Sequence, residues 1–228
     1  MTRKAALISI LTLCLASYLA VAADTTIDTT PFWNGIDYVH YFGYAGIQTA
    51  TYGQIVTVPT GPNTVLKSFS FFMDQNTTVN FRGEVYEWDA TNTMAIGPDL
   101  WEGAPMHTTN PDVFQQIDFV TGGVPLVAGN QYVVFATTIK DSGTGNGVWG
   151  YPLDDAYGGG AFAFLNNSIP TDPSQWTTDT WSTDWDGTGF DLAFKADFGP
   201  LGPQVPEPAT MALFALGIAG VVARRKKR

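Results

Sequence analysis

Residues 190–198 read Phe190-Asp191-Leu192-Ala193-Phe194-Lys195-Ala196-Asp197-Phe198, and they give the clearest indication of the fold. Apolar side chains take every second position, and mostly polar side chains take the positions between them. Because successive side chains of a β-strand point to opposite faces, this alternation predicts a strand with one buried face. The region from 24 to 198 shows no helical periodicity, so we expect strands to build its core.

Further strand patterns lie along the chain between clusters of turn-forming residues. Alternation recurs at 79–86 and 113–119, and the nearly continuous β-branched and aromatic run at 132–139 predicts a central strand. The remaining candidate strands lie at 54–58, 66–73 and 161–165, with turns rich in Gly, Pro, Asn and Asp at 59–63, 89–92, 141–147 and 158–160. Short strands separated by such turns predict an all-β fold, an antiparallel β-sandwich of jelly-roll-like form over residues 24–198.

The N-terminal segment has the organisation of a secretory signal peptide. Arg3 and Lys4 precede an apolar run at 5–19, and Ala20, Ala22 and Ala23 supply the small residues of a cleavage site. We therefore expect residues 1–23 to direct the chain to the Sec export machinery. The single cysteine lies inside this segment, at position 14, so the mature protein has no disulfide, thiolate metal site or cysteine nucleophile.

A second apolar run, at 209–223, lies between Pro206-Glu207-Pro208 and the basic cluster at 224–228. This run is shorter than the roughly 20 residues that a membrane-spanning helix usually needs, but long basic side chains can reach the headgroups and shorten the requirement. The basic cluster is expected on the cytoplasmic side. The sequence thus predicts a transmembrane helix at 209–223, and the two prolines within 199–205 predict a linker before it.

The segment from Val205 to Thr210, the apolar run and the terminal basic cluster together resemble the PEP-CTERM sorting signal of Gram-negative bacteria, a tail also labelled as an ice-binding protein C-terminal domain. The resemblance covers 206–228 and implies that an exosortase recognises the tail and cleaves it near Pro206, Glu207 and Pro208. It also implies a protein that is held in the inner membrane before processing. Afterwards the protein would reach the cell surface or matrix, in an exopolysaccharide or biofilm context.

The charge of the region between the two ends restricts its partners. Residues 24–205 contain four basic and 20 acidic side chains, a formal charge of −16. Such a field repels nucleic acid and anionic membranes, so neither is expected as a partner of the core. The membrane contact of this protein is expected only through the C-terminal helix, and only until the tail is removed.

Two groups of residues near position 185 are candidate binding sites. Asp184, Asp186 and Asp191 could offer carboxylate oxygens to calcium, although the spacing lacks the ligands of an EF-hand loop, and a polar turn explains the same residues. Calcium is the one cofactor that the sequence suggests.

Trp176, Trp181 and Trp185 could stack on sugar rings at an exposed surface. Alternatively, their indoles could close one end of the sandwich, with each N–H satisfied locally.

No catalytic motif is present, so we expect a protein that is not an enzyme. Glycoside hydrolysis needs only two carboxylates, which Glu84, Glu87 and Glu102 could supply, but solvated surface acids explain these residues better. The expected function is that of an exported surface or matrix protein, sorted by an exosortase and structural or adhesive there. The alternative is a carbohydrate-binding module for surface polysaccharide, and a secreted glycan hydrolase is a third class.

Overall fold

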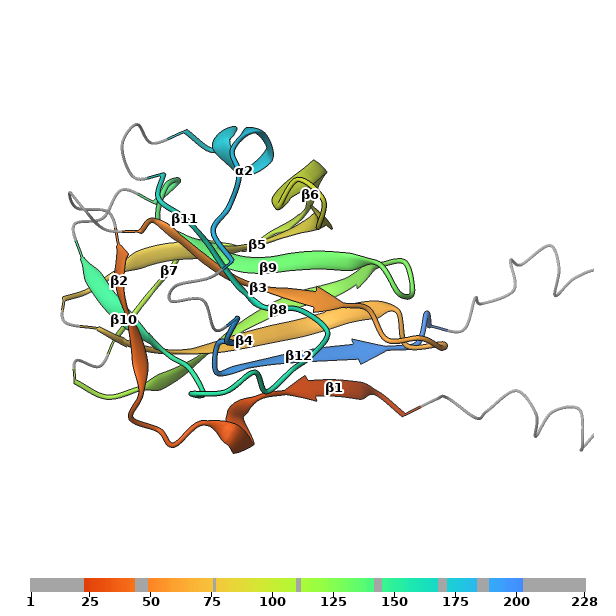
Figure 1. Ribbon diagram of the computed structural model, residues 1–228, viewed down its shortest axis with the longest axis horizontal. Coiled ribbons are helices and arrows are strands. Elements are labelled where there is room, and N and C mark those ends of the chain that lie inside the picture. Colours follow the sequence, from red (N-terminus) through yellow and green to blue (C-terminus); the bar gives the residue numbers. More distant parts are fainter. Residues whose placement is uncertain are drawn as a thin grey trace, which may run out of the picture.

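The computed structural model describes residues 23–43, 49–75, 77–109, 112–141, 145–167, 172–183 and 189–202. Within these residues, two six-stranded sheets pack face to face as a β-sandwich (Figure 1), which confirms the all-β prediction. The strand pairs within both sheets are antiparallel. The predicted transmembrane helix at 209–223 and all but the last residue of the predicted signal peptide lie outside the described residues. In the described part of the chain, the helices are too short or too polar to cross a bilayer.

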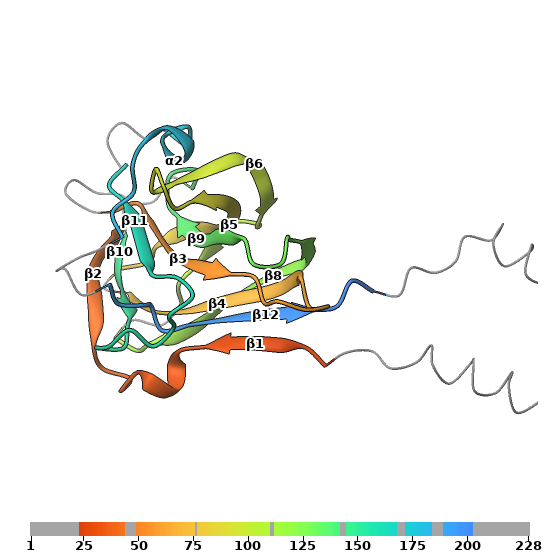
Figure 2. The same ribbon diagram turned by 45° about the vertical axis from the view of Figure 1, so that its right-hand side comes forward.

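The first sheet, called sheet A, contains the second half of the alternating segment 190–198, from which the all-β fold was predicted. Its order is β1 (Thr25–Asp28), β12 (Phe194–Gly199), β4 (Val65–Gln75), β10 (Asn146–Gly150) and β2 (Tyr38–Gly43), and β8 (Gln115–Pro125) pairs with β4 as well. The short 3-10 turn η1 (Thr30–Phe32) joins β1 to β2. Figures 1 and 2 both show that β1 begins and β12 ends at the same end of the sandwich, whereas η1 and β2 lie at the other end.

The second sheet, called sheet B, is built around the predicted central strand. Its order is β11 (Phe162–Leu165), β3 (Thr51–Thr57), β9 (Gln131–Thr137), β5 (Asn80–Asp89) and β6 (Met94–Glu102), and β7 (Met106–His107) pairs with the start of β5. The central position of β9, with β3 on one side and β5 on the other, confirms that prediction. Its residues from Tyr132 to Thr137 are all buried, because both faces of sheet B are covered.

The main core lies between the two sheets and is unusually aromatic. Trp149 of β10 is fully buried and contacts Phe42, Tyr52 and Phe71 with ring centroids 4.6–5.6 Å apart. Phe69 stacks on Phe119 at 4.7 Å. Aromatic pairs at these separations add to the stabilisation that burial of their area already gives. The domain therefore has a large core without any disulfide.

A second hydrophobic cluster covers the outer face of sheet B. The short helix α2 (Gln175–Thr178) lies over this face (Figure 1), and Trp176 and Trp181 pack there against Tyr86, Trp88 and Phe135. The sandwich thus has two hydrophobic layers, one on each face of sheet B. The outer face of sheet A carries no corresponding layer among the described residues.

The segment before β12 departs from the predicted alternation. Only Phe194–Gly199 is a strand, and Asp191 and Ala193, which the pattern assigned to the exposed face, are fully buried. The reason is that this segment crosses between the sheets. Phe162 of sheet B donates a backbone hydrogen bond to Phe190 O, and the Ala193 N–H donates to Gly150 O of sheet A. Side chains in such a crossing have protein on both sides.

Candidate functional site

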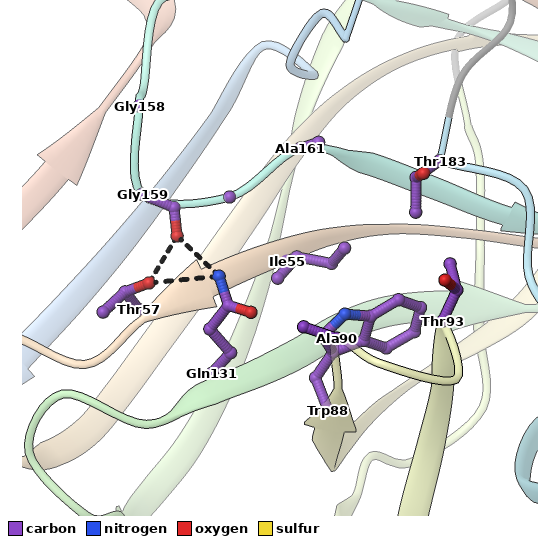
Figure 3. A pocket seen from close by; sticks show the side chains of 11 residues that line it. Ile55, Thr57, Trp88, Ala90, Thr93, Gln131, Gly158, Gly159, Ala161 and Thr183 are labelled. Atoms are coloured by element: carbon purple, nitrogen blue, oxygen red, sulfur yellow. Dashed lines mark hydrogen bonds between the residues drawn. The ribbon is translucent and has the colours of Figure 1, made fainter.

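A pocket of about 370 Å³ opens on the outer face of sheet B (Figure 3). Ile55 and Thr57 of β3, Gln131 of β9 and Trp88 of β5 form its floor and side, and the loop 158–161 forms one wall. The turn after β5 and the segment that follows Trp181 form the remaining wall. The pocket therefore lies where four separate parts of the chain meet.

A small polar group occupies one side of the pocket. The Thr57 hydroxyl donates to Gly159 O at 2.5 Å, and Gln131 Nε2 lies 3.4 Å from Thr57 Oγ1 and 3.5 Å from Gly159 O (Figure 3). Both Gln131 distances exceed the usual range for a hydrogen bond from nitrogen to oxygen. The Gln131 amide therefore keeps most of its capacity to bind the hydroxyl groups of a ligand.

The opposite side combines an indole with hydroxyl groups. Trp88 is 6% exposed and packs with its ring at a T-shaped angle to Trp181, with the ring centroids 5.7 Å apart. In the part of the chain that the structure describes, the Trp88 indole N–H and the hydroxyls of Thr93 and Thr183 have no hydrogen-bond partner. These groups can serve a polar ligand without first breaking an internal bond.

The loop 158–161 is held close to β3 by a glycine. A Cβ atom at Gly160 would lie 1.8 Å from Ile55 O, so any other residue would push the loop away. The Ile55 N–H donates to Ala161 O at 2.9 Å and fixes the loop beside the strand. The glycine run that predicted a turn thus also builds a wall of the pocket.

The chemistry of the pocket is that of a neutral binding site. None of the described residues that line it has an ionisable side chain, so these residues supply no general acid, general base or charged metal ligand. Amide, hydroxyl, backbone and indole groups instead offer neutral hydrogen bonds beside an apolar surface. This combination suits a small, uncharged, hydroxyl-rich molecule.

Three carboxylates form a separate cluster at the junction of β5 and β6. Glu84, Asp99 and Glu102 each offer an oxygen within 4.8 Å of the others. The structure thus brings together two of the three acids that the sequence suggested, leaves out Glu87, and adds Asp99. Lys140 Nζ lies 2.9 Å from Glu84 Oε1 and 2.5 Å from Glu102 Oε2.

The environments of these acids differ in a way that resembles an acid and base pair. Burial raises the pKa of Glu84 to about 7, against which the hydrogen bond from Lys140 acts only in part. The hydrogen bond from Lys140 lowers the pKa of Glu102, and Arg82 adds to this effect. However, the Lys140 ammonium occupies the position between the two carboxylates that a cation or a substrate would need. The cluster is therefore an internally paired charge network, buried only at Glu84, rather than an open site.

Asp191 is bound by groups of the protein itself. Gln54 Nε2 donates to Asp191 Oδ1 at 2.7 Å, and the backbone N–H groups of Ala156 and Tyr157 donate to Oδ2 at 2.9 and 2.7 Å. Burial raises the pKa of Asp191 to about 6 in spite of these bonds. The structure therefore does not present Asp191 as an open calcium ligand, and Asp184 and Asp186 lie outside the described residues.

The three tryptophans of the predicted sugar surface do not form an exposed platform in the described structure. Trp176 is 1% and Trp181 2% exposed, and Trp185 lies outside the described residues. The Trp181 indole N–H donates to Trp176 O at 2.9 Å. The Trp176 indole N–H donates to the amide oxygen of Asn167 at 3.1 Å, in the amide orientation that satisfies both Asn167 atoms, and lies 3.3 Å from Thr51 Oγ1. Both indoles are thus buried with their N–H groups satisfied, which was the alternative interpretation of the sequence. The pocket lies beside them and was not predicted.

Comparison with solved structures supports the fold alone. A variant of the clostridial cysteine protease Cwp84, after propeptide cleavage, matches with 12% identity and a TM-score of 0.50, covering 78% of this chain and 40% of that one. A structure of the cysteine protease and lectin-like domains of Cwp84, a surface layer associated protein of Clostridium difficile, matches with 15% identity and a TM-score of 0.40, over 67% and 32% of the two chains. The chain thus spans less than half the length of these proteins. No curated protein matches the sequence.

The sorting segment is the part of the chain that matches a known family model. Residues 204–227 match the model of the PEP-CTERM protein-sorting motif, and this range includes Pro206, Glu207 and Pro208. The match confirms the resemblance seen in the sequence, supports an exosortase-sorted surface protein, and implies recognition by exosortase, export and membrane-anchored processing. The chain carries a PEP-CTERM protein-sorting motif at residues 204–227, and the described domain that precedes it is a β-sandwich.

Proposed function

We propose that the sandwich is the adhesive module of an exosortase-sorted surface protein and binds neutral sugar units of extracellular polysaccharide. The observation that carries this proposal is the pocket on sheet B. It combines an indole with amide and hydroxyl groups, and its described lining residues carry no charge. The pocket volume of about 370 Å³ suits one or two sugar residues, as at a chain end or a side branch.

The charge of the domain favours a neutral ligand over an anionic one. Its four basic residues are all engaged in ion pairs: Lys67 with Asp24, Arg82 with Glu102 and Asp141, Lys140 with Glu84 and Glu102, and Lys195 with Asp28. The domain therefore offers no unpaired cation to a uronate or a sulfate group. A neutral polysaccharide is not repelled by the formal charge of −16 between residues 24 and 205.

Binding is a better account than catalysis. Glycoside hydrolysis needs two carboxylates placed on either side of a sugar bond. Glu84 and Glu102 are close together, but Lys140 contacts both, and the pocket lies elsewhere on sheet B. The proposal therefore assigns Glu84 and Glu102 to stability and the pocket to recognition.

Binding in the pocket is tested by titrating the purified domain with neutral mono- and oligosaccharides, using ligand-observed NMR and calorimetry. We expect Gln131→Ala to weaken binding about tenfold, because one amide contact to a ligand hydroxyl is lost. Ala90→Phe should abolish binding, since position 90 is exposed at the pocket wall and a phenyl ring there would fill the space. Val127→Ala, at a side chain that is 59% exposed outside the pocket, is the matched control.

Two results would contradict pocket binding. One is a wild-type protein that binds none of the neutral sugars. The other is unchanged affinity in both Gln131→Ala and Ala90→Phe, which would place the sugar elsewhere on the domain.

Sorting is tested separately, in a host that carries an exosortase. Mass spectrometry of the envelope and matrix fractions should find the sandwich without residues 224–228, because cleavage near Pro206-Glu207-Pro208 removes them. A mature protein that keeps Arg224 to Arg228 would count against sorting by exosortase, whatever the pocket binds.

A further inference from the structure

Four aromatic side chains gather on the outer face of sheet A, at the end formed by η1 and β2. Trp33, Tyr38, Phe72 and Phe114, which we call the aromatic face, all remain partly exposed. The Trp33 ring lies 5.4 Å from Phe72 and 4.9 Å from Phe114, and Tyr38 lies 6.5 Å from Phe114, centroid to centroid. These residues come from four segments that the sheet brings together, and no local motif in the sequence marks them.

The aromatic face is fixed in place by the backbone beneath it. Trp33 lies over Gly150 of β10, where an added Cβ would be 2.5 Å from the indole ring. The Trp33 indole N–H donates to Asp37 O at 2.8 Å, and Asn34 Oδ1 accepts from the backbone N–H groups of Ile36 and Asp37. The rings are therefore held before any ligand arrives, which lowers the entropy cost of binding.

The surroundings of the aromatic face are apolar and exposed to an unusual degree. Phe32 is 65%, Ile36 71%, Tyr38 42% and Val113 59% exposed. Monomeric proteins rarely leave large apolar groups gathered in one place unless the place binds something. Gln116 is exposed and pairs with Phe72 across β4 and β8. Its amide nitrogen donates to Asp118 Oδ1, which leaves the amide oxygen to accept from a ligand hydroxyl.

The charge of the domain limits what the occupant can be. The acidic side chains in the same segments include Asp37, Asp74, Asp112 and Asp118, and the four basic residues of the domain are paired with acids. Like charge therefore opposes an anionic lipid surface, a nucleic acid, an anionic polysaccharide and a second copy of this domain. An uncharged polymer with apolar faces and hydroxyl edges meets no such opposition.

The position of the aromatic face agrees with such an occupant. β1 begins and β12 ends at the opposite end of the sandwich (Figures 1 and 2), and the sorting motif follows β12 in the sequence. The aromatic face is thus at the end of the domain away from the point where the sorting motif is attached. A long polymer can lie across it without meeting that attachment point.

We propose that the aromatic face is a second glycan-binding site, on which the flat apolar faces of neutral pyranose units in a polysaccharide chain stack. It differs from the pocket in the part of the glycan that it takes. The pocket encloses a chain end or short branch, whereas the aromatic face is open and accepts the middle of a chain. With both sites, one domain could hold two chains together, and this consequence alone rests on the proposed function of the pocket.

The test is affinity electrophoresis of the sandwich domain through native gels that contain a neutral polymer, with hydroxyethyl cellulose, galactomannan and dextran as probes and alginate as the anionic comparison. We expect wild type to be retarded by at least one neutral polymer and not by alginate. Tyr38→Ala and Phe114→Ala should each reduce the affinity about tenfold. Phe114→Leu, which keeps an apolar side chain without a ring face, should lose as much as Phe114→Ala if stacking is the cause.

The matched control is Val120→Ala, at a side chain that is 73% exposed on the outer face of the same sheet and outside the aromatic face. Thermal unfolding of each variant shows that it is folded. Free migration of wild type through all three neutral gels, or unchanged retardation of both alanine variants, would overturn the proposal. So would a wild-type dimer in sedimentation analysis that Tyr38→Ala converts to a monomer, because the face would then serve self-association.

These outcomes are independent of those for the pocket. Oligosaccharide binding is measured in solution on short ligands, and polymer retardation is measured on long ones. A protein that fails the first experiment and passes the second would remove the pocket and leave the aromatic face in place.

Discussion

The two outer faces of the sandwich use the same kinds of side chain in opposite ways. On sheet B, Trp176 and Trp181 are buried in a second hydrophobic layer beneath α2. On sheet A, Trp33 and Tyr38 remain partly exposed. The difference is that the segment 172–183 folds back over sheet B, whereas no described segment forms such a layer over sheet A. An aromatic residue type therefore does not by itself indicate a binding surface. Whether a later segment of the chain folds back over that face of the sheet determines whether the aromatic side chains are buried or exposed.

The comparison also separates stability from recognition. The layer over sheet B encloses its indoles and satisfies their N–H groups within the protein. The aromatic face presents rings with open surface and has polar groups at its edge. Substitutions in the first region should thus affect folding, and substitutions in the second should affect binding.

The largest expected effect is on the buried layer. Trp181→Ala and Trp176→Ala should each lower the free energy of unfolding by about 3–5 kcal/mol, because a large buried ring is lost and a cavity remains. Urea unfolding followed by circular dichroism measures this loss. A cost below about 1 kcal/mol would show that the layer over sheet B is not part of the folded core.

The next effect concerns the segment that crosses between the sheets. Asp191→Ala leaves the Gln54 amide and the N–H groups of Ala156 and Tyr157 without their acceptor, and should cost about 2–4 kcal/mol. Because the structure binds Asp191 through protein donors, the cost should be equal in calcium and in EDTA. A wild-type melting temperature that rises with calcium, with no rise in Asp191→Ala, would instead restore the calcium site.

A smaller effect should appear as a pH dependence. Burial raises the pKa of Glu84 to about 7, above its value in the unfolded chain, so the folded state binds this proton more tightly. This contribution is complete below the unfolded pKa and is lost as the pH rises through about 7. Stability should therefore fall between about pH 4.5 and pH 7, by about 1–3 kcal/mol.

Glu84→Gln removes the titrating group while keeping the shape of the side chain. Chemical unfolding at several pH values should give a flatter profile for this variant between about pH 5 and pH 7 than for wild type. The pKa of Asp191, raised by burial to about 6, has the same sign and acts at lower pH, so both proteins should keep that part of the slope. Identical profiles for the two proteins would mean that Glu84 is already ionised at low pH.

The sequence predicted those strands whose side-chain pattern reports their burial directly. β9 was found because a strand covered on both faces is apolar throughout. β10 was missed because its glycines resemble a turn. Gly147 is needed where a Cβ would lie 2.7 Å from Asp74 O, and Gly150 where it would meet Trp33. A glycine that allows close approach and a glycine that allows a turn look the same in one sequence.

The binding surfaces could not be predicted in the same way. The pocket joins residue 55 to residue 160, and the aromatic face joins residue 33 to residue 114, so neither leaves a local motif. Trp176 and Trp181 were predicted as part of a sugar-binding surface because they are close together in the sequence. The sorting motif, by contrast, is contiguous, and the sequence was sufficient to find it.

The smallest expected effect is the stability cost of Tyr38→Ala. Tyr38 is 42% exposed, and its ring contacts His40 at 4.5 Å and Phe114 at 6.5 Å, centroid to centroid. Because so much of the ring is already in water, its removal should lower the free energy of unfolding by less than about 1 kcal/mol. Urea unfolding of Tyr38→Ala beside Trp181→Ala measures both faces on one scale. If Tyr38→Ala costs as much as Trp181→Ala, the aromatic face is a structural layer and the contrast between the two faces fails. A small cost together with a loss of polymer retardation would show that these rings are kept for a partner outside the domain.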